Sequence, residues 1–243
     1  MQVEFLSPYD NYHLSMAIDR RSFLKLAGVT GALSLFGLPE GFAATTDITH
    51  GSRSVPNVAL TFHGASNHVM GTELLTIFKE TKTPVSVFAV GTWLKQNPTF
   101  AQQIIADGHD LGNHTMNHYQ MKTLSARKVH SEISQCAAEL VKLSGSHGKW
   151  FRPSGTQYSN ATIRKAAVQL GYKQCISYDV DSHDYQDVST SALIKNVMST
   201  VKNGSIVSLH FGHANTIKAL PTLLDRLHSQ GLTPVTLTTL LGK

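Results

Sequence analysis

Short apolar runs alternate with longer amphipathic stretches along most of this chain, from about residue 56 to its end. Runs rich in β-branched and aromatic residues predict strands at 58–62, 85–89, 110–113, 149–152, 174–179, 205–210 and 234–237. Apolar residues at helical spacing, often after a polar N-cap such as Thr216, predict helices at 72–79, 99–106, 125–143, 160–170, 191–201 and 217–229. This alternation of strands and helices predicts an α/β fold in a single domain.

Chemically reactive residues follow the carboxyl ends of five predicted strands, which constrains how the strands are arranged. They are His63, the pair His114 and His118, Arg152, the stretch 179–184, and His210. In an open sheet, five strands at about 4.8 Å per step would spread these residues over roughly 20 Å. A closed barrel brings the same ends together at one rim, where barrel enzymes carry their active sites. We therefore expect a barrel of about seven strands.

The N-terminal region has the pattern of an export signal. Arg20 and Arg21 precede Ser-Phe-Leu-Lys and a mostly apolar run at 26–38, as in twin-arginine signals. The run is too short for a stable membrane span. Small residues at 41, 43 and 44 offer a cleavage point near Ala43 or Ala44. We expect a signal at 1–44, a lead-in at 45–55 and one domain at 56–243. The chain is then exported by the twin-arginine machinery, without a membrane span after cleavage.

The charge and cysteine content narrow the functional classes. The formal net charge is +5, and the Lys and Arg residues are scattered without a basic run or interleaved aromatic residues. Nucleic acid is therefore not an expected partner, whereas an anionic envelope polymer suits the charge. Cys136 and Cys175 permit at most one bridge, and we expect two separate buried thiols.

The pair His114 and His118 has metal-ligand spacing. Residues four apart lie on one face of a helical turn, so both imidazoles can reach one cation such as zinc. With 13 His in 243 residues this spacing also arises by chance, so its weight depends on the reactive residues elsewhere in the chain.

Several motifs together resemble one family. Residues 59–62, 108–115 with His118, 151–155, 178–185 and 209–210 resemble, in order and spacing, the five motifs of the NodB-homology polysaccharide deacetylases. The resemblance covers about residues 55–241. It implies a distorted (β/α)7 barrel and a metal-dependent carbohydrate esterase that removes N-acetyl or O-acetyl groups from a glycan.

The resemblance also implies roles for individual residues. His114 and His118 match two metal ligands, His210 matches the acid that protonates the leaving group, and Asp184 matches the carboxylate that orients it. Arg152 matches the arginine that pairs with the family's catalytic base; here it is free to hold Asp179, Asp181 or the substrate. Neighbouring positions are expected to contact substrate: Pro153, Gly155, Tyr185 and His213.

The first motif departs from the family pattern. Where the family has Thr-Phe-Asp-Asp-Gly, this chain has Thr-Phe-His63-Gly64-Ala, so His63 replaces the base and Gly64 replaces the metal-binding Asp. In one hypothesis His63 is the third metal ligand of a three-histidine site, and in a second it is the base while Asn67 or His68 completes the ligands. In a third, no catalytic metal binds.

These observations predict an exported glycan deacetylase with a divalent metal, of which zinc is the expected ion. Two other functions stay open. One is a catalytically impaired glycan-binding protein of the same fold, and the other is a hydrolase of a small non-glycan amide. Acetate release separates enzyme from binding protein, and mass analysis of the product separates the two substrates.

Overall fold

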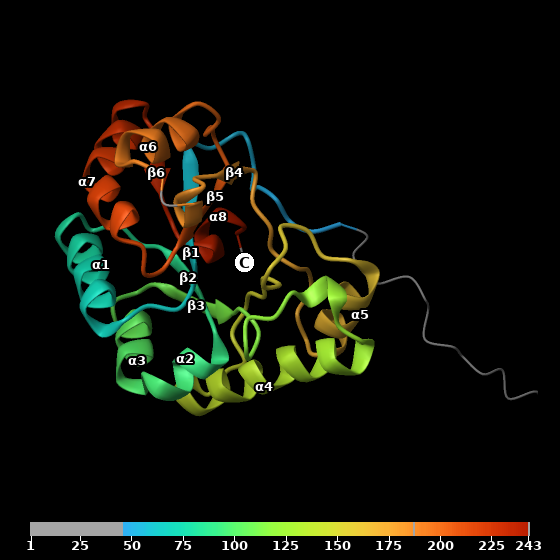
Figure 1. Cartoon of the computed structure of the whole chain (residues 1–243). Coiled ribbons are helices and arrows are strands. Elements are labelled where there is room, and N and C mark those ends of the chain that lie inside the picture. The colour runs from blue at the N-terminus through green and yellow to red at the C-terminus, as the bar shows by residue number, and fades with distance from the viewer. Residues whose placement is uncertain (1–45, 187, 243) are drawn as a thin grey trace, which may run out of the picture. The chain divides into compact units, whose positions relative to one another are not determined.

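The computed structural model describes residues 46–186 and 188–242. The predicted twin-arginine signal at 1–44, with Arg20 and Arg21, lies outside the described residues. A parallel sheet forms the centre of the fold, with the strand order β3-β2-β1-β5-β4 and with β6 pairing β1 off this path (Figure 1). The strands are β1 (Asn57–Gly64), β2 (Ser86–Ala89), β3 (Asp110–Asn113), β4 (Val180–Asp181), β5 (Ile206–His210) and β6 (Thr233–Pro234).

Single-residue bridges close the sheet into a ring. Asn113 at the end of β3 pairs with Phe151, and Phe151 pairs with Cys175, both in parallel. The chain then continues into β4, which pairs with β5, and β5 pairs with β1. The predicted strands at 149–152 and 174–179 were thus too long, because pairing there is confined to isolated bridges. The two-residue β4 was missed, since it contains no apolar run.

Helices surround this ring, except for the short C-terminal helix, whose leucines pack on the interior cluster (Figure 1). The α-helices are α1 (His68–Glu80), α2 (Gly91–Gln96), α3 (Pro98–Ala106), α4 (Ala126–Ser144), α5 (Ala161–Gln169), α6 (Thr190–Met198), α7 (Ala214–Ser229) and α8 (Leu237–Leu240). Two 3-10 turns are η2 (Met121–Thr123) and η3 (Asp184–Gln186). Asn67, Ser125, Asn160 and Ser189 cap helices by accepting a backbone N–H. Among the described helices, none has the length and apolar content needed to cross a membrane.

The start of α7 corrects one prediction. Thr216 was expected to be the N-cap, but the helix begins earlier and its N-cap is His213. Thr216 is buried inside the first turn, where its hydroxyl donates to the carboxylate of Asp184 at 2.6 Å. The polar residue before the apolar run was therefore a site residue and not a helix signal.

Buried side chains fill the interior of the ring, so the barrel is a packed core. Ala59, Phe88, Ile176 and Ile206, from four different positions of the wall, form one buried cluster with Trp150. Leu237 and Leu240 of α8 belong to the same cluster. Cys136 and Cys175 are free and buried, as predicted. Because the interior is filled, chemistry is confined to the loops at the carboxyl ends of the strands.

Candidate active site

Four imidazoles converge at the carboxyl ends of the strands. His63 in β1 and His210 in β5 are register partners, and their ring centroids are 4.0 Å apart. His114 follows β3, with its ring 5.0 Å from that of His63, and His118 lies 5.0 Å from His114. We call these four residues the imidazole row. The parallel ring explains the convergence, because β3, β1 and β5 all end at the same rim.

The segment from His114 to His118 is a loop, so the predicted helical turn is wrong. Thr115 and His118 have left-handed backbone conformations, with φ of 69° and 58°. A β-branched residue rarely adopts this conformation, and local contacts hold it here. The Asn113 side chain accepts from the Thr115 N–H at 2.9 Å, and the buried Glu132 carboxylate accepts from the backbone and side chain of the intervening Asn117. The loop, not a helix, brings the two histidines together.

His63 and His114 are neutral imidazoles with free nitrogens. Burial lowers the pKa of both well below the usual value, and the neighbouring histidines and Arg152 lower it further. His114 donates its Nδ1–H to the backbone carbonyl of Arg152 at 2.9 Å, which leaves Nε2 buried without a partner. His63 Nε2 lies 3.0 Å from the hydroxyl of Ser208, which leaves Nδ1 buried without a partner.

These two orphaned nitrogens match the donor type that zinc takes from histidine. A metal-binding histidine ordinarily donates its other ring N–H to a carbonyl or carboxylate, as His114 does. Burial also lowers the pKa of His118, so a third neutral imidazole lies beside the pair. Within 46–186 and 188–242, however, no three His, Cys, Asp or Glu side chains already form a complete metal-binding group. The donor chemistry fits a cation, and the third ligand is not in place.

His210 is held by a buried carboxylate. Asp184 is fully buried and accepts from His210 Nδ1 at 2.6 Å, from the His210 backbone N–H at 2.7 Å and from Thr216. Burial by itself would raise the pKa of Asp184, but these hydrogen bonds outweigh it and hold the pKa below its usual value. The contact fixes the proton on Nδ1 and leaves Nε2 of His210 available to a substrate.

The remaining predicted substrate residues fall into two groups. Tyr185 and His213 lie beside His210, with ring centroids 5.1 and 5.5 Å away. Pro153 is buried in the loop that follows Phe151, the residue that forms a bridge with the end of β3. Gly155, in the same loop, packs closely against the side chain of Gln120. The structure therefore places Tyr185 and His213 beside the imidazole row, whereas Gly155 has Gln120 as its close neighbour.

Arg152 is a buried cation whose observed hydrogen bonds are to neutral groups. It is 1% exposed and donates to Thr61 Oγ1 and to the carbonyl oxygens of Ile176 and Ser177. Burial lowers its pKa to about 9, although Tyr178 and Asp181 oppose this. Of the alternative partners considered for Arg152, Asp179 pairs with Arg53 instead, at 2.7 Å. Arg152 thus stabilises the barrel wall next to His63.

Sequence reasoning missed three neutral side chains that position the site. Ser208 holds His63, Thr61 holds Arg152, and Thr216 holds Asp184. One signal was available for the first two. Thr61 and Ser208 each lie two residues before a histidine of the row, on the same face of the same strand.

The comparisons with known proteins identify the family of this chain. The sequence profile named polysaccharide deacetylase matches residues 50–175. The chain belongs to the polysaccharide deacetylase family. A peptidoglycan-N-acetylglucosamine deacetylase of Bacillus cereus is 30% identical over 203 residues, which cover 77% of this chain and 91% of that protein. The predicted assignment to the polysaccharide deacetylase class of hydrolases is confirmed.

Solved structures of family members have the same fold. A CE4-family pseudoenzyme from Bacillus anthracis has a TM-score of 0.74 at 27% identity, covering 79% of this chain and 68% of that chain. The family 4 carbohydrate esterase from Streptomyces lividans, in complex with acetate, has a TM-score of 0.68 at 30% identity, covering 73% of this chain and 91% of that one. The predicted distorted (β/α)7 barrel is confirmed. Likeness to a pseudoenzyme is consistent with the divergent first motif of this polysaccharide deacetylase family member.

Proposed function

We propose that this chain is a metal-dependent deacetylase of an N-acetylated polysaccharide. The observation that carries the proposal is the buried contact between Asp184 and His210, beside the orphaned nitrogens of His63 and His114. A protein that only binds glycan has no chemical need to bury a carboxylate against an imidazole at the rim. The Bacillus cereus relative is named for N-acetylglucosamine in peptidoglycan, which supports an N-acetylated hexosamine as the substrate unit.

His210 supplies the proton that amide hydrolysis requires. The nitrogen of an amide leaves only after it is protonated, so a positioned acid is needed. Asp184 accepts from Nδ1, which directs the Nε2 side of His210 to the substrate. Tyr185 and His213 flank this ring, which supports the proposal that they contact the sugar. Asp184 itself stays ionised, because its hydrogen bonds hold its pKa below the usual value.

His63, His114 and His118 are the residues that would hold the metal. A bound divalent ion polarises a carbonyl and supplies a nucleophilic hydroxide near neutral pH. His63 and His114 offer neutral, orphaned nitrogens, and His118 lies 5.0 Å from His114, ring to ring. His63 stands where the family has its carboxylate base, so the site has no separate carboxylate base once His63 serves as a ligand. We expect slower turnover for that reason, since a positioned base typically contributes about 10²- to 10⁴-fold.

A catalytically impaired glycan-binding protein is the second candidate. It is favoured by the absence, within the described residues, of a complete three-residue metal group, and by the likeness to a CE4-family pseudoenzyme. Under this hypothesis His63 stays bonded to Ser208 and the row binds sugar without hydrolysis.

Export is part of the same proposal. The twin-arginine pattern at Arg20 and Arg21 directs the chain out of the cytoplasm, where an acetylated wall polymer is available. Removal of the first 44 residues by a signal peptidase is testable by N-terminal sequencing of the exported protein.

Metal content and acetate release together test the proposal. The purified chain is incubated with zinc, desalted and analysed by elemental analysis beside His63→Ala, with His130→Ala as a control for an exposed histidine. We expect about one zinc per chain, lost in His63→Ala and kept in the control. Zinc retained in His63→Ala would assign His63 to the base role. No zinc in any variant, with no acetate released from an N-acetylated glycan, would leave the glycan-binding function.

A further inference from the structure

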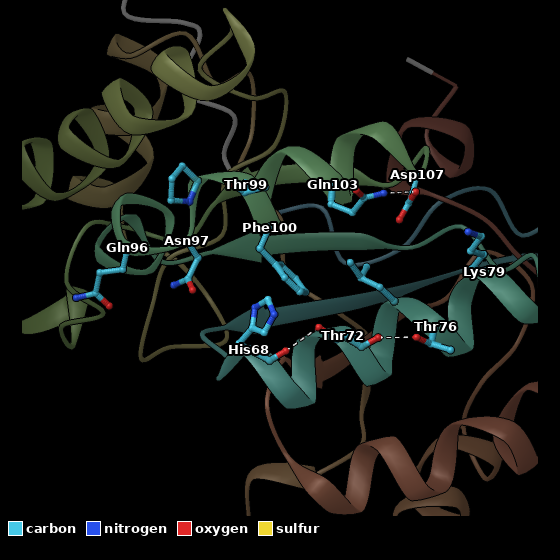
Figure 2. Close-up of a pocket in the computed structure, with 12 residues that line it drawn as sticks. His68, Thr72, Thr76, Lys79, Gln96, Asn97, Thr99, Phe100, Gln103 and Asp107 are labelled. Carbon is cyan, nitrogen blue, oxygen red and sulfur yellow. Dashed lines mark hydrogen bonds between the residues drawn. The ribbon is translucent and has the colours of Figure 1, made fainter.

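A groove of about 480 Å³ lies between α1 and α3, on the outer wall of the barrel (Figure 2). Its floor contains the buried Leu75 and the half-buried Phe100. Its volume is within the range of small-molecule sites. None of the four histidines of the imidazole row lines it, so it is separate from the site described above.

The lining is neutral overall and rich in hydrogen-bonding groups. Lys79 and Asp107, of opposite charge, lie at one end (Figure 2). The walls carry hydroxyls and planar amides: Thr72, Thr76, Thr99, Gln96, Asn97 and Gln103. The first two hydroxyls donate to carbonyl oxygens of α1, which leaves their oxygens free to accept. Such a lining suits a neutral ligand with many hydroxyl and amide groups, and not an ion.

Phe100 provides an apolar surface within this polar lining. Its ring packs directly on Gly71 of α1, where an added Cβ would lie 2.7 Å from the ring. The ring also contacts His68 and Phe211, with centroids 5.9 and 6.1 Å away. The weakly polar C–H face of a pyranose can pack on such a ring while its hydroxyls bond to the walls.

The groove leads away from the active-site rim. α1 begins five residues after His63, and α3 follows β2 and α2, so both helices start near the carboxyl ends of the strands. Phe211, against which Phe100 packs, directly follows His210. Figure 2 shows His68 and Asn97 near one end of the groove and Lys79 and Asp107 at the other. The end of the groove at His68 is therefore the end nearer the rim.

We propose that this groove binds pyranose units of a neutral N-acetylated glycan chain, outside the imidazole row. The choice of glycan as the occupant rests on the proposed function. The groove then acts as a second contact for the polymer, and longer chains bind more tightly than short ones because they reach both places.

Binding of the β-1,4-linked tetramer of N-acetylglucosamine tests this inference. The tetramer is titrated into the full chain while backbone amide shifts are followed by NMR. Amides at 72–79 and 96–107 are expected to shift with the ligand. Thr76→Lys places a long charged side chain in the groove at an exposed helix position, and is expected to weaken this binding at least about tenfold. Gln103→Ala, also exposed, removes one amide and is expected to weaken binding less.

Thr222→Lys is the matched control. It makes the same change at an exposed position of α7 outside the groove, and the dissociation constant is expected to stay unchanged. Shifts confined to residues around the imidazole row, or no binding of the tetramer, would overturn the inference. Acetate release is measured separately. If groove amides shift but no acetate is released, the groove binds glycan and the proposed enzymatic activity is wrong. If acetate is released but groove amides do not shift, the proposed activity stands and the inference about the groove is wrong.

Discussion

Asp184 contacts His210 twice, accepting from Nδ1 at 2.6 Å through one oxygen and from the backbone N–H at 2.7 Å through the other. A single fully buried carboxylate therefore fixes both the ring and the main chain of this histidine. The arrangement makes the position and tautomer of His210 a property of the fold, present before any substrate arrives.

His210→Ala removes the proposed acid and keeps all the proposed metal ligands. We expect acetate release to fall by about 10²- to 10⁴-fold while zinc content stays unchanged, because protonation of the leaving nitrogen is lost and metal binding is not. His228→Ala, an exposed histidine on α7, should retain full activity. If His210→Ala lost zinc and activity in equal proportion, His210 would be a ligand and its assignment as the acid would be wrong.

Gly64→Asp restores a carboxylate where the family carries its metal-binding Asp. An added Cβ meets no atom within 4 Å, but the backbone φ of 105° is unfavourable for any residue except glycine. We expect zinc to bind at least about tenfold more tightly, at a cost in stability of about 1–3 kcal/mol. Gly64→Ala has the same backbone cost without the carboxylate. Equal zinc affinity in the two variants, measured by chelator competition, would contradict a metal site at the end of β1.

Neutral His63 and His114 make stability depend on pH. Their folded pKa values lie below the unfolded value of about 6.5, so the unfolded chain binds more protons as the pH falls. The metal-free chain is therefore expected to keep its full unfolding free energy above about pH 7 and to lose about 1.4 kcal/mol per pH unit for each histidine below that.

Urea unfolding of the chelator-treated chain between about pH 7.5 and 5 measures this dependence. His63→Gln should reduce the slope of unfolding free energy against pH by about 1.4 kcal/mol per pH unit, because Gln does not titrate. His130→Gln, at an exposed position, should leave this slope unchanged. Identical slopes in the parent chain and His63→Gln would mean that His63 is not held neutral in the folded state.

Arg152 is expected to matter more for stability than a surface arginine. Arg152→Met leaves the buried oxygens of Ile176 and Ser177 without their donor, and we expect a loss of about 3 kcal/mol or more. Arg53→Met removes a partly exposed pair with Asp179 and is expected to cost about 1 kcal/mol. Thermal or urea unfolding of both variants measures the difference. Similar losses would show that Arg152 is not a structural element of the wall.

The sequence predicted the convergence of the row because parallel strands in a ring all end at one rim. It did not predict how the row is held. The sequence spacing of His114 and His118 is the same in a helix and in this loop, and the left-handed backbone of Thr115 and His118 distinguishes the two structures. The partners of Arg152 are mostly main-chain oxygens, which leave no trace in residue identity. The predicted strand lengths were wrong where the pairing is reduced to single bridges, as at Phe151.

Those bridges leave the barrel wall with one weakly paired side, between Asn113 and Phe151, which we call the seam. β1 and β5 share five register pairs, whereas the pairing beyond β3 is reduced to isolated bridges at Phe151. Amide exchange by local opening should therefore be fastest along that side. His114 stands on one side of the seam and bonds to the carbonyl of Arg152 on the other. A ligand that fixes His114 is therefore expected to strengthen the link across this part of the wall and to slow amide exchange there.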